Sequence, residues 1–318
     1  MSEPGEVLRP TDAWAGKRVD AWLAAQFPAF SMAAIRKLLA ARAVRKGGKI
    51  CAKGDRVCPG EAYTLLQAPE PEATLQANPE LPVAVLYEDE VLLAVDKAAG
   101  MDCQPNGPEE TETLANGLLA RYPELRGIGD GPLTCGILHR IDRETSGLVL
   151  VARTQSAYDA LRAQFSAHTV VKRYLALASG EITRPGRLEH WLAHNPRCPG
   201  RMIDASVWRD VKRPMRAVSE FRPLRVVPIA FPQSGSRPYT LLEVSIQTGV
   251  THQIRAQLSL AGMPLLGDKR YGGAQMQGFP RHFLHAAEAT FRHPATGQEM
   301  TLRAPLPPDL ARICQGRR

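Results

Sequence analysis

The stretch HRIDRETSGLVLVART, residues 139–154, places a polar and charged segment directly before a run of apolar residues. The apolar run is short and aliphatic, which is typical of a strand buried inside a sheet. Asp142 therefore lies where a loop meets a buried strand, and a carboxylate there needs a partner because burying an unpaired charge is costly. From this stretch alone, Asp142 could cap a turn, pair with Arg140 or Arg143, or perform chemistry.

On both sides of this stretch, from Val83 onward, apolar runs alternate with amphipathic segments. The strand-like runs are AVLY, VLLAVD, LVLVA, YLALA and LLEVSI, and the amphipathic segments include TLANGLLARY and SAYDALRAQF. This alternation predicts an α+β domain of catalytic size. The sequence contains no repeat of 20 to 50 residues, and no glycine motif for a dinucleotide or a nucleotide phosphate in the required context.

The N-terminal part of the chain carries the net positive charge. Residues 17–56 contain ten Lys and Arg residues against only Asp20 and Asp55, which accounts for the formal net charge of +8. The remaining 30 cations and 30 anions cancel. A short basic module of this kind indicates contact with the phosphate backbone of a nucleic acid.

This basic module has the pattern of a small α+β unit. Apolar residues recur at helical spacing in two segments, Val19, Trp22, Leu23 and Phe27 in the first and Ile35, Leu38 and Leu39 in the second. Pro28 interrupts the two predicted helices and Ser31 is placed to cap the second. Residues 44–65 follow as short predicted strands separated by glycine-rich turns, with the cations on the turns.

Four segments are predicted along the chain. They are an N-terminal tail at 1–15, the basic unit at 16–66, a proline-rich and acidic linker at 67–82, and a catalytic domain at 83–318. The six cysteines are scattered, and the N-terminus lacks a secretory pattern. No apolar run approaches the roughly 18 residues of a membrane-spanning helix. We therefore expect a protein of the reducing cytoplasm with no membrane association.

The 139–154 stretch closely resembles the HRLDxxTSG signature of the RluA/RluD-type RNA pseudouridine synthases. Further blocks similar to this family follow in the family's order: VLYEDEVLLAVDKAAGM at 85–101, KRYLALASG at 172–180, TGVTHQIRAQLSLAGMPLLGDKRYGG at 248–273 and FLHAAEATFRHPATGQEMTLRAPLP at 283–307. Several ordered motifs of this length are far more specific than one short pattern.

The resemblance implies the pseudouridine synthase fold, a mixed and largely antiparallel sheet flanked by helices and loops. The basic unit at 16–66 resembles the alpha-L RNA-binding domain, first seen in a ribosomal protein and present in many members. The implied activity is the isomerisation of uridine to pseudouridine in structured RNA. Ribosomal RNA of the large subunit is the first expected substrate and transfer RNA the second. No cofactor, metal or obligate protein partner is implied.

Four residues take catalytic or binding roles by this resemblance. Asp142 matches the essential aspartate, which either attacks the anomeric carbon or removes the 2′ proton, and both routes require an ionised carboxylate. Arg255 matches the arginine that pairs with this aspartate. Tyr174 matches the tyrosine that stacks on the target base. Arg140 matches the arginine that fills the gap left when the uridine is flipped out of its stack.

Supporting residues are also implied. His139, His252 and Gln253 complete matching blocks and are expected to hold the site rather than react, while Thr145, Ser146 and Gly147 are expected to form the turn that sets the Asp142 loop. The cations expected to contact RNA in the basic unit are Arg36, Lys37, Arg42, Arg45, Lys46 and Lys49. Departures from the family pattern are Val250 in place of a basic residue, Ala98 in place of a proline, and CQPNG at 103–107.

Three rival interpretations have weaker support. His190, His194 and Cys198 are spaced as zinc ligands on a helix would be, but Pro196 and Pro199 would break that helix. A binding protein without activity would be expected to have lost one of the catalytic residues, and all are present. A glycosidase generally places two carboxylates about the scissile bond, whereas this signature offers one acid flanked by arginines.

Overall fold

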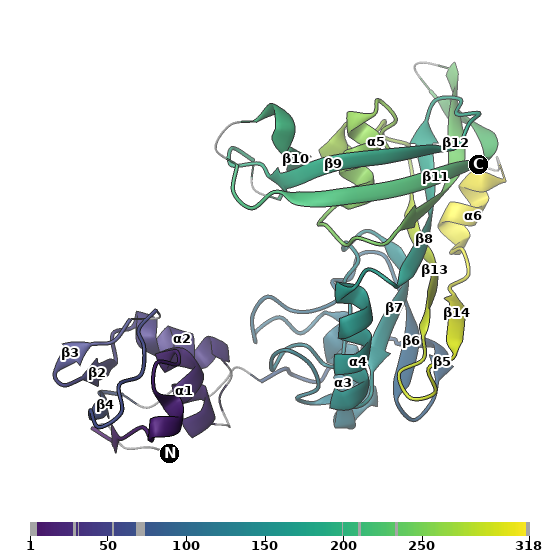
Figure 1. The fold of residues 1–318 in the computed structure, drawn as a ribbon. Coiled ribbons are helices and arrows are strands. Elements are labelled where there is room, and N and C mark those ends of the chain that lie inside the picture. Colours follow the sequence, from purple (N-terminus) through teal and green to yellow (C-terminus); the bar gives the residue numbers. More distant parts are fainter. Residues whose placement is uncertain are drawn as a thin grey trace. The chain divides into compact units, whose positions relative to one another are not determined.

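The chain forms two compact units, Met1–Thr74 and Leu75–Arg318. The computed structural model describes residues 5–27, 30, 32–52, 54–67, 74–198, 200–208, 211–232 and 235–315, with only the backbone of residue 33. Figure 1 shows a small helical and stranded unit at the N-terminal end and a larger unit built on a long sheet.

The small unit, unit 1, combines two helices with a short antiparallel sheet. Its elements are β1 (Val7–Leu8), η1 (Asp12–Trp14), α1 (Val19–Gln26), α2 (Met32–Ala40), β2 (Val44–Lys46), β3 (Lys49–Ile50) and β4 (Tyr63–Leu65). The sheet order is β1-β4-β2-β3. The two helices are present at the predicted positions, and their apolar faces are buried against the sheet. At the centre of this core the rings of Trp22 and Tyr63 lie 4.7 Å apart. Pro28 and the predicted cap Ser31 lie outside the described residues.

The predicted N-terminal tail is wrong for residues 5–15, which belong to unit 1. The β1 strand pairs with β4, and Leu8 and Trp14 pack against the core. The amide of Leu65 donates to the carbonyl of Glu6 at 2.9 Å. This pairing satisfies backbone groups that β4 would otherwise expose as an edge strand.

The predicted linker is too long at its C-terminal end. Leu75 is 3% exposed and belongs to the core of the larger unit, unit 2. The Asn78 amide donates to the carbonyl of Asn116 at 3.0 Å, and the Asn116 side chain donates to the carbonyl of Gln76 at 2.7 Å. A single buried leucine among prolines and polar residues gives no hydrophobic periodicity, so composition alone did not reveal these contacts.

Unit 2 is built on a ten-stranded sheet. Its strands are β5 (Ala84–Glu88), β6 (Leu92–Lys97), β7 (Ser146–Ala152), β8 (Val171–Ser179), β9 (Gly186–His194), β10 (Met202–Asp204), β11 (Met215–Phe231), β12 (Gly235–Ile246), β13 (Leu284–Arg292) and β14 (Glu299–Arg303). The order is β10-β9-β11-β12-β8-β13-β7-β6-β5, with β14 paired to β13. All pairs are antiparallel except β13 with β7. The expected α+β fold with a mixed, largely antiparallel sheet is confirmed.

Helices cover different parts of this sheet. They are α3 (Leu114–Arg121), α4 (Gln155–Ser166), α5 (Gln253–Leu260) and α6 (Pro308–Cys314), with the short turns η2 (Pro123–Leu125), η3 (Ala205–Val207) and η4 (Lys269–Tyr271). Figure 1 shows α3 and α4 beside the β6 and β7 part of the sheet and α5 beside β9 and β11. None of the helices in the described ranges has the length and apolarity needed to cross a bilayer.

The middle of the sheet positions the Asp142 loop. Every residue of β7 is buried, because the strand lies between β6 and β13 and packs against α4. The loop that contains Asp142 leads into the first residue of β7, Ser146, which pairs with His285 at the start of β13. The catalytic candidate therefore stands at the end of the most deeply buried strand.

Candidate active site

A cleft of about 1040 Å³ in unit 2 contains the residues singled out from the sequence. The loop before β7, strand β8, the segment after β12 and helix α5 all contribute to its walls. Asp142, Tyr174, Arg255, Arg140 and His252 line it, although they lie up to 115 residues apart along the chain. The fold thus gathers the predicted site residues around one opening.

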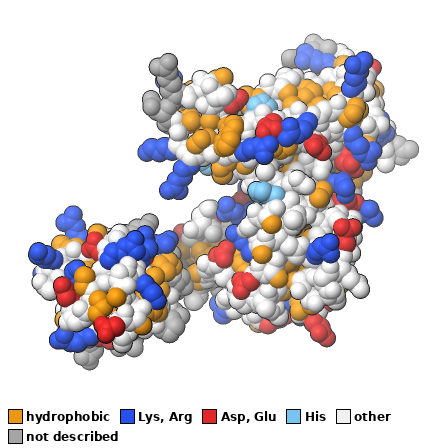
Figure 2. Space-filling model, in the orientation of Figure 1, with side chains coloured by type: hydrophobic (Ala, Val, Ile, Leu, Met, Phe, Trp, Pro, Cys, Tyr) orange, Lys and Arg blue, Asp and Glu red, His pale blue; other side chains and the backbone are white. Residues whose placement is uncertain are grey.

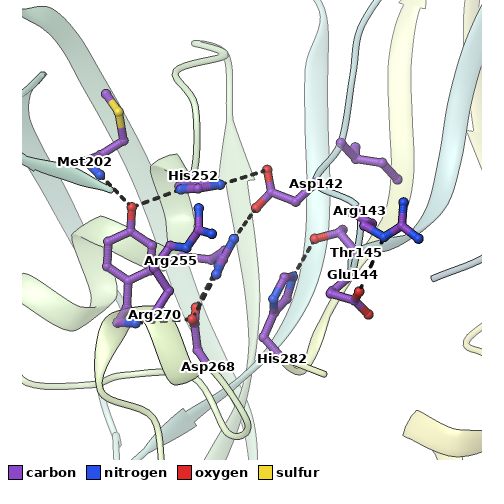
Figure 3. A network of polar contacts seen from close by, with 12 residues as sticks. Asp142, Arg143, Glu144, Thr145, Met202, His252, Arg255, Asp268, Arg270 and His282 are labelled. Carbon is purple, nitrogen blue, oxygen red and sulfur yellow. Dashed lines mark hydrogen bonds and ion pairs between the residues drawn. The ribbon is translucent and has the colours of Figure 1, made fainter. Parts of the chain in front are cut away.

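The Asp142 loop is held from the side of β13. Its turn is closed by the Thr145 amide, which donates to the carbonyl of Asp142 at 2.9 Å. The Thr145 hydroxyl lies 2.7 Å from Nε2 of His282, as Figure 3 shows. Ser146 and Gly147 were expected in this turn, but they are the first residues of β7.

Gly147 is required by a close backbone approach. Its φ is +117°, and a Cβ built on it would lie 2.2 Å from the carbonyl oxygen of Ala286. Other residues avoid this conformation and would meet the β13 backbone. The glycine therefore allows β7 and β13 to approach directly behind the Asp142 loop.

Arg255 joins Asp142 to a second carboxylate (Figure 3). Its Nη1 donates to Oδ2 of Asp142 at 2.8 Å, while Nε and Nη2 donate to Asp268 at 2.7 and 2.9 Å. The side chains of Arg255 and Asp268 are 8% and 1% exposed, and that of Asp142 is 23% exposed. The guanidinium is thus fixed on its buried side, while Asp142 reaches toward the cleft.

The electrostatics of this triad favour the charged forms of Arg255 and Asp268. Burial lowers the pKa of Arg255, but its hydrogen bonds and the charges of Asp268 and Asp142 outweigh burial and raise it overall. Burial raises the pKa of Asp268, and the bonds to Arg255 reverse this and lower it. A permanently charged guanidinium therefore faces Asp142.

Tyr174 is the fourth residue of β8 and is 7% exposed. Burial raises the pKa of its hydroxyl, and the negative charge of Asp142 adds to this effect. No hydrogen bond to this hydroxyl occurs within the described ranges, and the residue lines the cleft.

His252 caps α5 in a left-handed conformation, with φ of 53° and ψ of 23°. Its Nδ1 lies 3.0 Å from the Tyr271 hydroxyl, and its Nε2 lies 3.9 Å from Oδ1 of Asp142. Burial lowers the pKa of His252. At 3.9 Å a neutral imidazole makes no hydrogen bond to the carboxylate, so His252 shapes the wall beside Asp142.

Two other supporting residues hold backbone segments. The Gln253 side chain accepts from the Thr248 hydroxyl at 2.8 Å and donates to the Val218 carbonyl at 2.9 Å, which ties the segment before α5 to β11. His139 accepts from the Leu150 amide at 3.1 Å and stacks on Phe165. Burial lowers the pKa of His139 to about 3, so the ring remains a neutral acceptor.

Arg140 is exposed at the cleft, and no ion pair involves it among the described residues. The neighbouring Arg143 differs, because its Nη1 donates to Asp102 at 2.7 Å. Arg140 is therefore available to a ligand, while Arg143 braces the loop. Val250, which replaces a basic residue of the family pattern, packs against the cluster that contains Tyr271.

Sequence reasoning missed several residues that hold the site. Asp268 anchors Arg255, His282 holds Thr145, and Lys97 donates to the carbonyls of Ala98, Met101 and Arg143 at 2.7, 2.6 and 3.1 Å. Arg281 makes two hydrogen bonds to Asp309 and one to the Glu144 carbonyl. Asp268 and Lys97 stand inside the blocks that carry the family resemblance, and that position was their only signal.

The predicted RNA-contacting cations lie on unit 1. Arg36, Lys37, Arg42, Arg45 and Lys49 are exposed, and Lys46 is half-buried with its Nζ 3.3 Å from Cys58 Sγ. Arg36 also lies 3.5 Å from Asp20. Figure 2 shows Lys and Arg side chains spread over the visible face of this unit. Lys53, counted in the basic module, lies outside the described residues.

The zinc interpretation receives no support from the backbone, because His190 and His194 lie on strand β9 and not on a helix. Within the described part of the chain, no group of three or more His, Cys, Asp or Glu side chains could hold a metal ion.

Comparison with known proteins gives a consistent result. The family model described as RNA pseudouridylate synthase matches residues 91–260. The ribosomal large subunit pseudouridine synthase D of Xanthomonas campestris pv. campestris is 33% identical over 315 residues, covering 95% of this chain and 89% of the relative. The protein of the same name from Escherichia coli O6:H1 is 29% identical, covering 94% and 90%.

A solved structure agrees in fold. Human RNA Pseudouridylate Synthase Domain Containing 1 superposes with a TM-score of 0.56 at 24% identity, covering 72% of this chain and 86% of that one.

Proposed function

This chain belongs to the RNA pseudouridylate synthase family, and we propose that its substrate is a uridine of large-subunit ribosomal RNA. The protein is an RNA pseudouridine synthase, an isomerase. The observation that carries the substrate proposal is the near full-length similarity to relatives named for the large ribosomal subunit, which covers 94–95% of this chain in the two relatives above.

The reaction exchanges one bond to the ribose for another. The bond from N1 of uracil to C1′ breaks, the base turns, and C5 bonds to C1′. The hydrogen of C5 leaves as a proton and N1 takes up a proton, so the product is an isomer of the uridine. We assign Asp142 as the carboxylate that starts this exchange, either by attack on C1′ or by removal of the 2′ proton. Both routes need the ionised form, and the guanidinium of Arg255 donates a hydrogen bond to this carboxylate at 2.8 Å.

Tyr174 is assigned to hold the base while it turns. Its ring lines the cleft, and a planar face retains a planar base without fixing its rotation. Burial holds the pKa of its hydroxyl above the usual range, so the residue enters the reaction protonated. The hydroxyl is then a hydrogen-bond donor to the base.

Arg140 is assigned to the RNA beside the flipped nucleotide. Flipping a base costs a few kcal/mol of lost stacking, and a planar guanidinium can stack on the bases left exposed. Its exposure and the absence of an ion pair among the described residues support this role.

Unit 1 is assigned as an alpha-L RNA-binding domain. The support is its two helices and adjoining strands together with its exposed cations. A basic surface of this kind binds phosphates without reading sequence, so it would add affinity while the cleft selects the uridine. A ribosomal RNA substrate would also place the protein in the cytoplasm.

The test is the release of tritium from RNA labelled at C5 of uridine. Transcripts of large-subunit ribosomal RNA, partly assembled large-subunit particles and transfer RNA are each incubated with wild type and with Asp142→Asn. We expect release from a large-subunit substrate by wild type alone. Release from transfer RNA only would refute the substrate proposal, and no release from any RNA by folded protein would refute both.

A further inference from the structure

Lys172 is a buried lysine on the cleft wall whose ammonium makes one hydrogen bond within the described structure. Its side chain lies two residues before Tyr174 on the same face of β8, and it is 7% exposed. Nζ donates to the Thr248 carbonyl at 3.0 Å and lies 5.5 Å from the centroid of the Phe165 ring. An ammonium has three donors, so two remain without an oxygen partner in the described structure.

Lys97 shows how this chain treats a buried lysine that only supports structure. It is 1% exposed, and all three of its donors are taken by backbone carbonyls. Lys172 has one such bond, and no carboxylate among the described residues pairs with it. A buried cation left in this state is costly, and ionisable groups in such surroundings cluster at functional sites.

Gly249 lies beside this ammonium at the cleft. It is exposed, and its backbone does not occupy the left-handed region that favours glycine. A Cβ built on Gly249 would meet a single neighbour within 4 Å, Nζ of Lys172 at 3.6 Å. An alanine would therefore fit, but it would cover the ammonium.

An oxygen anion that arrives with the substrate could accept the two remaining hydrogen bonds of this ammonium. Alternate residues of a strand lie about 7 Å apart along its backbone, and both Lys172 and Tyr174 line the cleft. Phosphates carry a full charge in RNA before any reaction, whereas the oxygens of uracil are neutral acceptors. Only a phosphate compensates the charge of Lys172 in the resting complex.

We propose that the Lys172 ammonium binds a backbone phosphate next to the uridine that stacks on Tyr174. This inference rests on the proposed role of the cleft. Binding replaces the missing partners with charge-assisted hydrogen bonds and positions the ribose between Tyr174 and Asp142. Burial lowers the pKa of free Lys172 to about 8, and a bound phosphate would raise it.

The first experiment follows the pKa of Lys172 by NMR of the full chain with labelled lysine. The resonance is assigned by its loss in Lys172→Met. The probe is hexauridylate, and the control probe is the same oligomer with neutral methylphosphonate linkages. We expect hexauridylate to raise the pKa of Lys172 by at least about one, with no change for the neutral oligomer. An unchanged pKa with hexauridylate, or an equal rise with both probes, overturns the proposal.

The second experiment measures affinity. Lys172→Met should bind hexauridylate about 10- to 100-fold more weakly, because charge-assisted hydrogen bonds are lost, and should bind the neutral oligomer as wild type does. Gly249→Ala should weaken hexauridylate binding in the same direction and serves if Lys172→Met does not fold. Wild-type affinity in both variants contradicts the phosphate contact. Neither readout depends on turnover, so failure of the proposed function would appear separately as an absence of tritium release.

Discussion

Asp268 accepts two hydrogen bonds from Arg255, from Nε at 2.7 Å and from Nη2 at 2.9 Å, and so leaves Nη1 for Asp142. Asp268 is almost fully buried, while Asp142 is partly open to the cleft. Whenever Asp142 engages a substrate, Arg255 would lose one partner. Asp268 keeps that buried cation paired throughout, so Asp142 could act as proposed without leaving Arg255 unpaired.

Asp268→Asn should therefore damage both stability and turnover. Removing one charge of a buried pair typically costs about 3–5 kcal/mol of unfolding free energy. The loosened Arg255 should also lower kcat, by about 10- to 100-fold, with little change in KM. Urea unfolding and tritium-release kinetics check the two effects. Wild-type kcat in a folded Asp268→Asn protein would show that Arg255 needs no second carboxylate.

Asp142→Asn should leave the free energy of unfolding nearly unchanged while it removes most of the turnover. Arg255 retains Asp268, so we expect a loss of unfolding free energy of only about 1 kcal/mol. Turnover should fall by at least about a thousandfold, because the amide keeps the shape of the side chain and removes its charge. RNA affinity should stay within about twofold of wild type. A variant that also melts early or loses RNA binding would identify Asp142 as a structural residue.

Gly147→Ala should destabilise the protein more than an ordinary glycine substitution. The new Cβ would lie 2.2 Å from the Ala286 carbonyl oxygen, so β7 and β13 must separate behind the Asp142 loop. We expect a loss of at least about 3 kcal/mol and a reduced kcat. Gly100→Ala is the matched control, because its φ is +88° and a Cβ there meets nothing within 4 Å. Its cost should be about 1–2 kcal/mol, and equal losses in the two variants would rule out the close approach.

Local sequence patterns were sufficient for the elements that carry the site. The apolar run of β7 and the polar segment before it placed Asp142 at a strand end, and the runs of β6 and β8 were equally plain. The family blocks then named Tyr174 and Arg255 in one site. Each of these signals spans a few neighbouring residues, which a single sequence can reveal.

Contacts between distant segments could not be read in this way. Thr145 and His282 are 137 residues apart, and nothing in the spacing of either predicts their hydrogen bond. Arg255 was expected to pair with Asp142, but only the folded chain shows that it lies in α5 and that Asp268 faces it. The open donors of Lys172 likewise became visible only when its surroundings were known.

Acid should destabilise the protein partly through His282. Burial, followed by the charge of Arg255, lowers the pKa of His282 to about 4 from 6.5. The unfolded chain then takes up the proton first as the pH falls. The stability that the neutral form of His282 contributes to the fold is complete above about pH 6.5 and is lost progressively down to about pH 4. The total loss of unfolding free energy is about 3 kcal/mol. Urea unfolding between these pH values should show a shallower pH dependence in His282→Gln than in wild type. Parallel curves would mean that His282 is not held neutral in the fold.

The basic surface of unit 1 should reveal itself in the salt dependence of RNA binding. Arg42, Arg45 and Lys49 are exposed and have no ion pair among the described residues. Replacing all three with alanine should lower the slope of log affinity against log salt by about 2–3, since each phosphate contact contributes about 0.7–0.9. The value of kcat on saturating RNA should not change, because the cleft lies in unit 2.

The matched control for this triple variant replaces Arg187, Arg216 and Arg222, which are exposed on unit 2 and paired with glutamates. It removes the same charge from the protein as a whole, so a general electrostatic effect would lower both slopes equally. A direct role of unit 1 requires a larger decrease in the first variant than in the control. An equal decrease of the slope in both variants would mean that the salt dependence follows from net charge. That result would remove the support for unit 1 as an RNA-binding domain.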